Sequence, residues 1–164
     1  MTSDCADRGW LEAVVFEQMR PEDLAAVLAI ERTSFPSAWS ADSYLRELRN
    51  PSSHYFVARL GGEVIGYAGM WVVGDEAHVS TIAVQFDRRR QGLGERLMHH
   101  LMAVARRYQA AYMTLEVRET NLAAQALYRK LGFQAAAIRP RYYGDTGEDG
   151  MVMHKALGEL TGTD

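Results

Sequence analysis

Apolar residues recur along the chain with the two spacings that distinguish helices from strands. Leu93, Leu97 and Leu101 follow one another four residues apart, which places them on one face of a helix. Proline and glycine mark the breaks between such segments. These patterns predict helices that begin at Arg20-Pro21 and at Ser40-Ala41, and helices over 92–108 and 121–131. They also predict a strand that begins at Val14 and strands over 54–60, 64–73, 77–84, 112–117, 133–138 and 150–157.

The order of these segments predicts the fold class. The strands over 54–60, 64–73 and 77–84 are joined by short turns, the first of them at Gly61-Gly62, and should form an antiparallel meander. Strands and helices then alternate toward the end of the chain. We therefore expect an α+β (mixed α/β) fold with helices packed on a central sheet.

Length and composition are those of a globular domain. The 164 residues are 48% hydrophobic and 24% charged. We expect one domain over 13–158, a flexible N-terminal tail over 1–12 and a C-terminal tail over 159–164. No apolar run reaches the roughly 18 residues of a membrane span, and the first residues lack the apolar region of a secretory signal. The expected location is the cytoplasm.

The charged and metal-binding residue types exclude several classes of partner. Eighteen Lys+Arg and twenty-one Asp+Glu give a net charge of −3, whereas nucleic-acid and anionic-membrane binders need a basic surface. A single cysteine, Cys5, excludes a disulfide framework. The histidines lack metal-ligand spacing, so no metal is expected, and His99 and His100 should be surface residues. The sequence leaves the oligomeric state open.

A glycine loop between a predicted strand and a predicted helix suits a phosphate group. Residues 88–94 read Arg-Arg-Arg-Gln-Gly-Leu-Gly. The first N–H groups of a helix have no intrahelical acceptor and attract anions. Gly92 and Gly94 lack the Cβ atoms that would keep a phosphate away, and the arginines should supply charged donors. The predicted ligand is a phosphate or pyrophosphate.

Glycine loops of three kinds fit this segment to different degrees. A Walker A loop needs a lysine that is absent here. A dinucleotide fingerprint needs a third glycine where Leu97 stands and a parallel βαβ setting, so it is a distant alternative, although Glu116 lies at a suitable distance. The segment Arg89–Gly94 matches a third pattern, Arg/Gln-x-x-Gly-x-Gly/Ala, which resembles the acyl-CoA pyrophosphate loop of the GNAT acetyltransferase superfamily. Taken alone, the loop also fits a charged helix cap.

Two downstream segments extend this resemblance. Leu115–Arg118 reads Leu-Glu-Val-Arg, and residues 121–133 fit the pattern Asn-x-x-Ala-x-x-Leu-Tyr-x-x-x-Gly-Phe. From about residue 13 to residue 157 the chain resembles GNAT N-acetyltransferases, and more narrowly the RimI-type enzymes, which acetylate the N-terminal alanine of a small-subunit ribosomal protein. Further marks of that group are Phe35-Pro36 with Trp39-Ser40, and Arg139–Tyr143 followed by Glu148-Asp149.

The resemblance implies a fold and a co-substrate. The family fold is a twisted mixed sheet of about seven strands flanked by about four helices. The sheet is splayed between the strands that correspond to 77–84 and 112–117, and acetyl-CoA lies in the splay. The cofactor-binding residues that the resemblance implies are Ile82, Ala83, Val84, Arg89, Arg90, Gln91, Gly92, Leu93, Gly94, Glu95 and Asn121.

Acetyl transfer to a protein N-terminus requires acid–base groups. The amine has a pKa of about 7.7–8.0 and must lose a proton before it attacks the thioester. Glu116, at the end of a strand, is the expected general base, and Tyr128 is the expected general acid for the departing thiolate. The Val84 amide is the expected oxyanion donor. Both side-chain assignments match the RimI-type pattern and imply direct transfer in a ternary complex, since Cys5 in a tail is a poor nucleophile.

Each of these residues also fits a structural role by itself. Tyr128 suits a core aromatic residue, Glu116 suits a surface acid, and Asn121 suits a helix N-cap. Their order behind the glycine loop favours the enzyme. The alternatives are an acetyltransferase for another amine, such as a lysine side chain or a small molecule, or a non-catalytic acyl-CoA-binding module.

The acceptor is expected to bind between two loops. Phe35 and Trp39 belong to the first, and Tyr142 and Tyr143, which could donate hydroxyl groups to a peptide backbone, belong to the second. Glu31 and Asp149 are candidates to attract the ammonium end of the peptide. RimI-type enzymes commonly read Phe-Pro-Trp-Ser, whereas Ser37-Ala38 intervene here, which leaves the fine specificity open.

Overall fold

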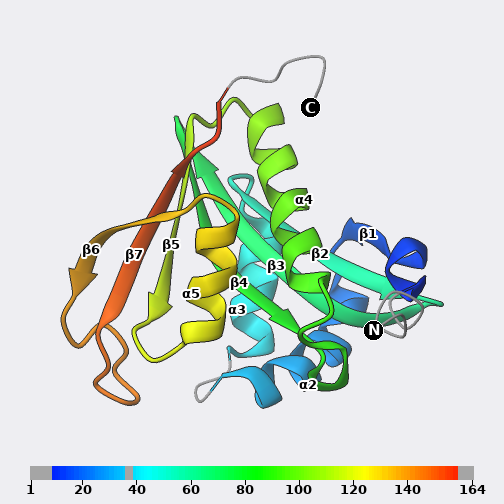
Figure 1. Cartoon of the computed structure of the whole chain (residues 1–164). Coiled ribbons are helices and arrows are strands. Elements are labelled where there is room, and N and C mark those ends of the chain that lie inside the picture. The colour runs from blue at the N-terminus through cyan, green and yellow to red at the C-terminus, as the bar shows by residue number, and fades with distance from the viewer. Residues whose placement is uncertain (1–8, 36–38, 159–164) are drawn as a thin grey trace. The chain divides into compact units, whose positions relative to one another are not determined.

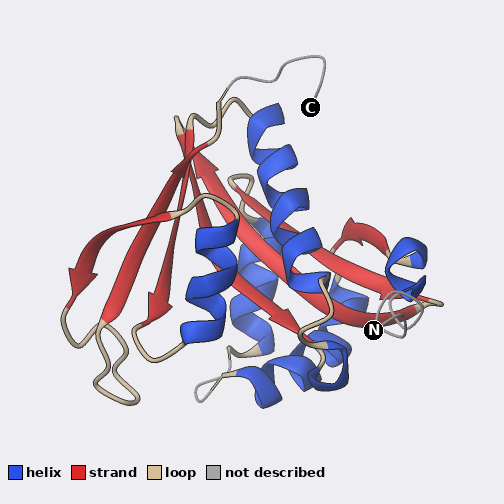
Figure 2. Ribbon diagram, in the orientation of Figure 1, coloured by secondary structure: helices blue, strands red, loops and turns tan. Residues whose placement is uncertain are grey.

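The computed structural model describes residues 9–35 and 39–158 (Figures 1 and 2). Cys5, the Ser37-Ala38 insertion and the predicted C-terminal tail lie outside the described residues. The main elements in chain order are β1 (Val15–Gln18), α2 (Leu24–Ser34), α3 (Ala41–Arg49), β2 (Ser53–Leu60), β3 (Glu63–Val73), β4 (Glu76–Val84), α4 (Leu93–Arg107), β5 (Tyr112–Arg118), α5 (Leu122–Lys130), β6 (Gln134–Arg139) and β7 (Gly150–Ala156).

The strands form a mixed seven-stranded sheet in the order β1-β2-β3-β4-β5-β7-β6. The neighbours β4 and β5 run parallel, with His78 opposite Thr114, while β5 and β6 each pair antiparallel with β7. Gly61 and Gly62 both have positive φ angles, +58° and +87°, as a two-residue hairpin turn requires. The mixed α/β fold with seven strands and four α-helices that the sequence predicts is confirmed.

The contacts within the chain divide it into two compact units. Unit 1 comprises residues 1–69 and 81–100, and unit 2 comprises residues 70–80 and 101–164. Three elements, β3, β4 and α4, run from one unit into the other. The single domain expected over 13–158 stays a prediction.

The core of unit 1 is built from α2, α3 and the strands near them. Ser40 accepts a hydrogen bond from the Ser43 N–H and thereby caps α3, as its position before the helix predicts. Strand β1 pairs antiparallel with β2. The buried cluster of this unit consists of Met19, Leu24, Val27, Ile30, Tyr44, Tyr55, Val57, Val64, Tyr67 and Ala83. Burying so many large apolar side chains holds these elements together.

Unit 2 is built on β5, β7 and β6, which lie side by side in Figure 1. Strand β5 pairs with β7 along its whole length, from Tyr112 opposite Ala156 to Arg118 opposite Gly150. Gln125 of α5 donates hydrogen bonds to the carbonyl groups of Arg118 (3.0 Å) and Glu119 (2.9 Å), which ties the helix to the end of β5. The end of β5 and the start of α5 are therefore held together by a buried amide side chain.

Residues 9–12 differ from the flexible tail that the sequence predicts. Gly9–Ala13 form a 3-10 helix in which Leu11 is buried. The Trp10 indole donates to Gln91 at 3.2 Å, and Arg96 donates to the Leu11 carbonyl at 3.0 Å. Polarity of the neighbouring residues suggested a tail, but two apolar side chains and these long-range hydrogen bonds order the segment.

His100 also differs from its predicted surface position. Its ring lies 4.4 Å from that of Phe56 and 5.0 Å from that of Phe16, measured between centroids. His99, one position earlier on the helix, is exposed as expected. Neighbouring positions on a helix point about 100° apart, so one of the two faces the aromatic residues while the other faces solvent.

Candidate functional site

The glycine loop lies in unit 1 between β4 and α4. After β4 ends, a 3-10 helix covers Phe86–Arg88, and α4 begins at Leu93. Arg90 and Gly92 have φ angles of +61° and +102°, so the backbone passes through left-handed conformations between the two helices. Backbone of this kind turns successive N–H groups toward one side, and the first N–H groups of α4 add to them. The loop therefore fits an anion such as a pyrophosphate.

The Arg89 side chain does not serve as the free donor that the sequence suggests. Its Nε–H donates to the Val84 carbonyl at 3.0 Å, and its Nη2 donates to Ser34 Oγ at 2.9 Å. These hydrogen bonds fasten the loop to the end of β4 and to the last turn of α2. Arg90, by contrast, is exposed. The loop therefore offers a phosphate its backbone N–H groups and the exposed Arg90 guanidinium.

The end of β4 carries the residues predicted to pair with the cofactor. Ala83 is buried, and Ile82 and Val84 are half-buried. The next N–H group, that of Gln85, donates to the Ile65 carbonyl of β3 at 2.8 Å. The Val84 carbonyl accepts the Arg89 Nε–H, while the role of the Val84 N–H group as oxyanion donor stays a prediction.

Glu116, the predicted general base, lies in β5 of unit 2. Its side chain is 11% exposed. Oε2 lies 2.8 Å from His78 Nε2, while Oε1 lies 4.0 Å from the nearest guanidinium nitrogen of Arg139. One oxygen is therefore in close contact with the imidazole nitrogen, and the other retains lone pairs that can accept a proton.

Tyr128, the predicted general acid, lies in α5 with 7% of its surface exposed. Burial, with a smaller contribution from Tyr143, raises the pKa of Tyr128 to about 12. The hydroxyl group is therefore protonated near neutral pH, as a proton donor must be. Asn121 caps α5 because its Oδ1 accepts the Ala124 N–H at 3.1 Å, which leaves its side-chain NH₂ for a ligand.

Residues 140–149, which we call the acceptor loop, carry Tyr142 and Tyr143. Arg118 at the end of β5 donates to Asp145 at 2.8 and 3.1 Å and to Glu148 at 3.0 Å. These hydrogen bonds lower the pKa of Asp145, and the Arg118 guanidinium also lies 4.1 Å from the ring centroid of Tyr143. Tyr142 is 44% exposed and meets Tyr143 edge to face at 5.0 Å. Arg118 thus fastens the loop that presents both tyrosines.

Glu31 and Asp149, the two acids predicted to attract an ammonium group, are both engaged within the fold. Glu31 is 1% exposed and accepts hydrogen bonds from the hydroxyl groups of Tyr44 and Tyr67 and from the backbone N–H of Trp39. A carboxylate so enclosed holds α2, α3 and β3 together and is not a surface charge for a ligand. Asp149 accepts a backbone N–H group of its own loop at 3.0 Å.

The predicted acceptor residues of unit 1 lie on either side of residues 36–38, which the structure does not describe. Phe35 is half-buried and packs against the apolar cluster of unit 1. Trp39 is 36% exposed, and its ring lies 5.1 Å from that of Tyr44. Trp39 therefore keeps an exposed aromatic surface, whereas Phe35 contributes to packing.

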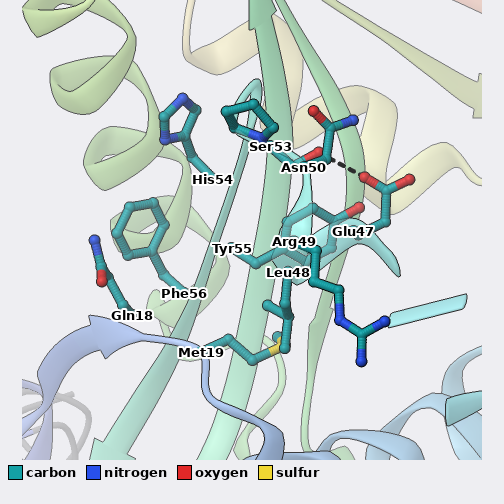
Figure 3. Close-up of a pocket in the computed structure, with 11 residues that line it drawn as sticks. Gln18, Met19, Glu47, Leu48, Arg49, Asn50, Ser53, His54, Tyr55 and Phe56 are labelled. Atoms are coloured by element: carbon teal, nitrogen blue, oxygen red, sulfur yellow. Dashed lines mark hydrogen bonds between the residues drawn. The ribbon is translucent and has the colours of Figure 1, made fainter. Parts of the chain in front are cut away.

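A separate hollow lies in unit 1 between β2 and the end of α3 (Figure 3). Its volume is about 280 Å³, and Ser53 donates to Glu47 at 2.5 Å across its polar side. It is lined by Gln18, Met19, Glu47, Leu48, Arg49, Asn50, Pro51, Ser53, His54, Tyr55 and Phe56. None of these described residues belongs to the predicted site.

Within 9–35 and 39–158, no three His, Cys, Asp or Glu side chains are grouped so that they could hold a metal ion. No helix in these ranges is long and apolar enough to cross a membrane.

Sequence reasoning missed two residues that the structure brings to the site. His78 contacts Glu116 across the parallel pair β4 and β5, and strand register cannot be deduced from one sequence. Arg118 stands in the Leu-Glu-Val-Arg segment, yet nothing local shows that it binds Asp145 and Glu148, about 30 positions later. The signal for this pairing in the sequence was a charged residue at the end of a buried strand, followed by two acids in a polar loop.

The chain is similar in sequence and in structure to known proteins. The model of the acetyltransferase (GNAT) family matches residues 24–133. The ribosomal protein bS18-alanine N-acetyltransferase of Escherichia coli is 38% identical over 135 residues, which cover 80% of this chain and 89% of the relative. The N-alpha-acetyltransferase RimI of Mycobacterium tuberculosis is 40% identical over 125 residues, which cover 74% of this chain and 77% of the relative. The crystal structure of the Escherichia coli ribosomal-protein-S18-alanine N-acetyltransferase superposes with a TM-score of 0.82 at 33% identity, over 92% of this chain and 97% of that one.

Proposed function

Because the chain belongs to the GNAT family of acetyltransferases, we propose that it transfers the acetyl group of acetyl-CoA to the N-terminal amine of a protein. The acceptor we propose is the N-terminal alanine of a ribosomal small-subunit protein. The observation that carries this choice is the 38% identity to the Escherichia coli bS18-alanine enzyme over 89% of that enzyme's length. Ribosomal proteins are made in the cytoplasm, which agrees with the location expected from the sequence.

The residues of unit 1 are proposed to bind acetyl-CoA. The left-handed backbone at Arg90 and Gly92 and the open N–H groups at the start of α4 suit the pyrophosphate. The exposed Arg90 guanidinium can pair with a phosphate oxygen. Arg89 supports the loop from beneath through Val84 and Ser34. The pantetheine arm is assigned to backbone groups of residues 82–84, and Asn121 of unit 2 contributes its side-chain amide.

The acid–base chemistry is assigned to side chains of unit 2. Glu116 Oε1 takes a proton from the attacking ammonium group, directly or through a water molecule. The neutral amine attacks the thioester carbonyl, and the Val84 N–H group stabilises the oxygen on which negative charge develops. Tyr128 donates its hydroxyl proton to the departing CoA thiolate, which its pKa of about 12 permits. The carbon–sulfur bond breaks after the carbon–nitrogen bond has formed, the second proton of the former ammonium group passes to solvent, and no covalent enzyme intermediate forms.

The peptide is proposed to contact the exposed aromatic surfaces of Trp39 and Tyr142 and the hydroxyl group of Tyr143, with Phe35 supporting the first of these loops. Arg118 keeps the two tyrosines in place through Asp145. Transfer to another amine, such as a lysine side chain, remains the alternative function because the acceptor loops set that choice.

A peptide panel tests this function. The purified protein is incubated with acetyl-CoA and peptides that differ in their first residue, and each product is read by intact mass and fragment spectra. Acetylation confined to the α-amine of alanine- or serine-initiated peptides supports the proposal. Acetylation only of lysine side chains or of free polyamines would overturn it.

The substitution Glu116→Gln tests the assigned base. We expect most activity to be lost at neutral pH and partly regained at higher pH, where the amine is already neutral. Glu119→Gln, which changes an exposed acid just beyond the same strand, is the matched control and should behave as wild type. A loss that does not vary with pH would mean that Glu116 positions the amine and does not deprotonate it.

A further inference from the structure

Glu116 is the first member of a chain of side-chain contacts that runs along β4 and β5. Its Oε2 lies 2.8 Å from His78 Nε2. On the other side of the same imidazole ring, Nδ1 lies 2.7 Å from Thr114 Oγ1. Thr114 in turn donates its hydroxyl proton to Glu76 Oε2 at 2.7 Å. All four side chains belong to unit 2, and each is at least partly buried.

The imidazole is also fixed from its face. The Trp71 ring stacks on His78 with 5.1 Å between ring centroids and 25° between ring planes. His78 and Glu116 have only 17% and 11% of their side-chain surfaces exposed. A hydrogen bond to a charged group in such a setting is stronger than one between neutral groups in water. The chain therefore determines where Glu116 points.

We propose that His78 is a positioning residue for the general base: its Nε2 holds Glu116 by Oε2, and so leaves Oε1 as the oxygen that accepts the proton of the amine. Thr114, Glu76 and Trp71 hold the imidazole ring in turn. This inference rests on the proposed function, because it presupposes that Glu116 is the base.

Other charged and titratable groups face the same chain of side chains. Arg139 of β6 lies 4.0 Å from Glu116 Oε1, and the Tyr112 hydroxyl of β5 donates to Glu76 Oε1 at 3.5 Å. Burial, and to a lesser degree the charge of Glu116, raises the pKa of Tyr142 and that of Tyr143 in the acceptor loop. The two tyrosines therefore stay neutral near pH 7, which leaves Arg139 as a fixed positive charge beside the chain.

Two substitutions at His78 separate its contact with Glu116 from its stacking on Trp71. His78→Phe keeps a ring that can stack on Trp71 but removes both nitrogen atoms, and we expect kcat to fall about 10- to 100-fold with the KM for acetyl-CoA unchanged. His78→Gln keeps an N–H donor for Glu116, so it should regain part of that loss.

Controls assign each failure to its cause. His154→Gln, an exposed histidine opposite Thr114 on β7, should leave kcat and its pH profile unchanged. Adding His78→Phe to Glu116→Gln should cost nothing further, since the positioned group is already gone. If Glu116→Gln abolishes turnover while His78→Phe matches wild type, the inference about His78 is overturned and the proposed function stands. If Glu116→Gln turns over as wild type does, the assigned base is wrong, and the role of His78 falls with it.

Discussion

Gly150 offers a direct test of whether Tyr142 contacts the acceptor. A Cβ atom added at Gly150 would lie 2.9 Å from both Cβ and Cδ1 of Tyr142 and 3.0 Å from its Cγ. Non-bonded carbon atoms prefer separations of about 3.5–4.0 Å. The substitution Gly150→Ala must therefore push the Tyr142 side chain away by roughly half an ångström or more.

The displacement should affect binding more than stability. Because the contact includes the Tyr142 Cβ atom, rotation of the ring alone cannot relieve it, and the loop backbone at Tyr142 must shift together with the ring. Tyr142 is 44% exposed and belongs to a loop, so we expect the shift to be taken up there and not in the pairing of β5 with β7. Loss of one aromatic contact costs about 0.5–1.5 kcal/mol, which corresponds to a rise of about 2- to 13-fold in the KM for the peptide. The kcat and the KM for acetyl-CoA should stay close to the wild-type values, because neither depends on the acceptor loop.

The assay is steady-state release of CoA with an alanine-initiated peptide varied at saturating acetyl-CoA. Gly144→Ala is the matched control, since it adds the same methyl group to the same loop at a position with nothing within 4 Å. A thermal unfolding scan of both variants checks that the strands are intact. If the two variants share the wild-type KM for the peptide, Tyr142 does not form part of the acceptor site.

Two further substitutions test other parts of the molecule. Tyr128→Phe retains the buried ring but removes the proposed acid, so turnover should slow by about 100-fold or more while acetyl-CoA still binds; unchanged turnover would remove Tyr128 from the mechanism. Asp23→Asn tests a buried ion pair of unit 1: burial raises the pKa of Asp23, but hydrogen bonds from Arg59 and from the Arg20 N–H outweigh it, and the pKa lies below its ordinary 3.8. Because the folded pKa is depressed, the stabilisation is present above pH 3.8 and is lost as pH falls through the folded value. Urea unfolding from pH 7 to pH 3 should therefore show wild type losing more stability than Asp23→Asn, and parallel curves would contradict this.

Much of the fold could be predicted from local signals. Pro21 opens a 3-10 helix, Ser40 caps α3 and Asn121 caps α5, because each residue acts on backbone groups within three positions of itself. Gly61 and Gly62 turn the chain for the same local reason. The glycine loop and the Asn-to-Phe pattern over 121–133 were likewise readable, and they led to the family that the comparisons bear out.

The partners of charged side chains could not be predicted in the same way. Arg89 was predicted to contact the cofactor, and the structure shows it donating to Val84 and Ser34; Glu31 was a candidate to attract an ammonium group, and the structure buries it against Tyr44. In both cases the sequence shows that a charge is present, while the partner of that charge depends on which elements pack beside it.

The sequence by itself determined the elements, the fold class and the family, because these follow from hydrophobic periodicity, capping residues and motif spacing within short stretches of chain. Only the tertiary structure decided how the acid–base groups are held. His78 reaches Glu116 because β4 and β5 pair in parallel with His78 opposite Thr114. Arg118 reaches Asp145 because the acceptor loop returns to the end of β5. Strand register and loop closure are set by the packing of the whole domain, and a one-residue shift in register would have turned His78 to the other face of the sheet.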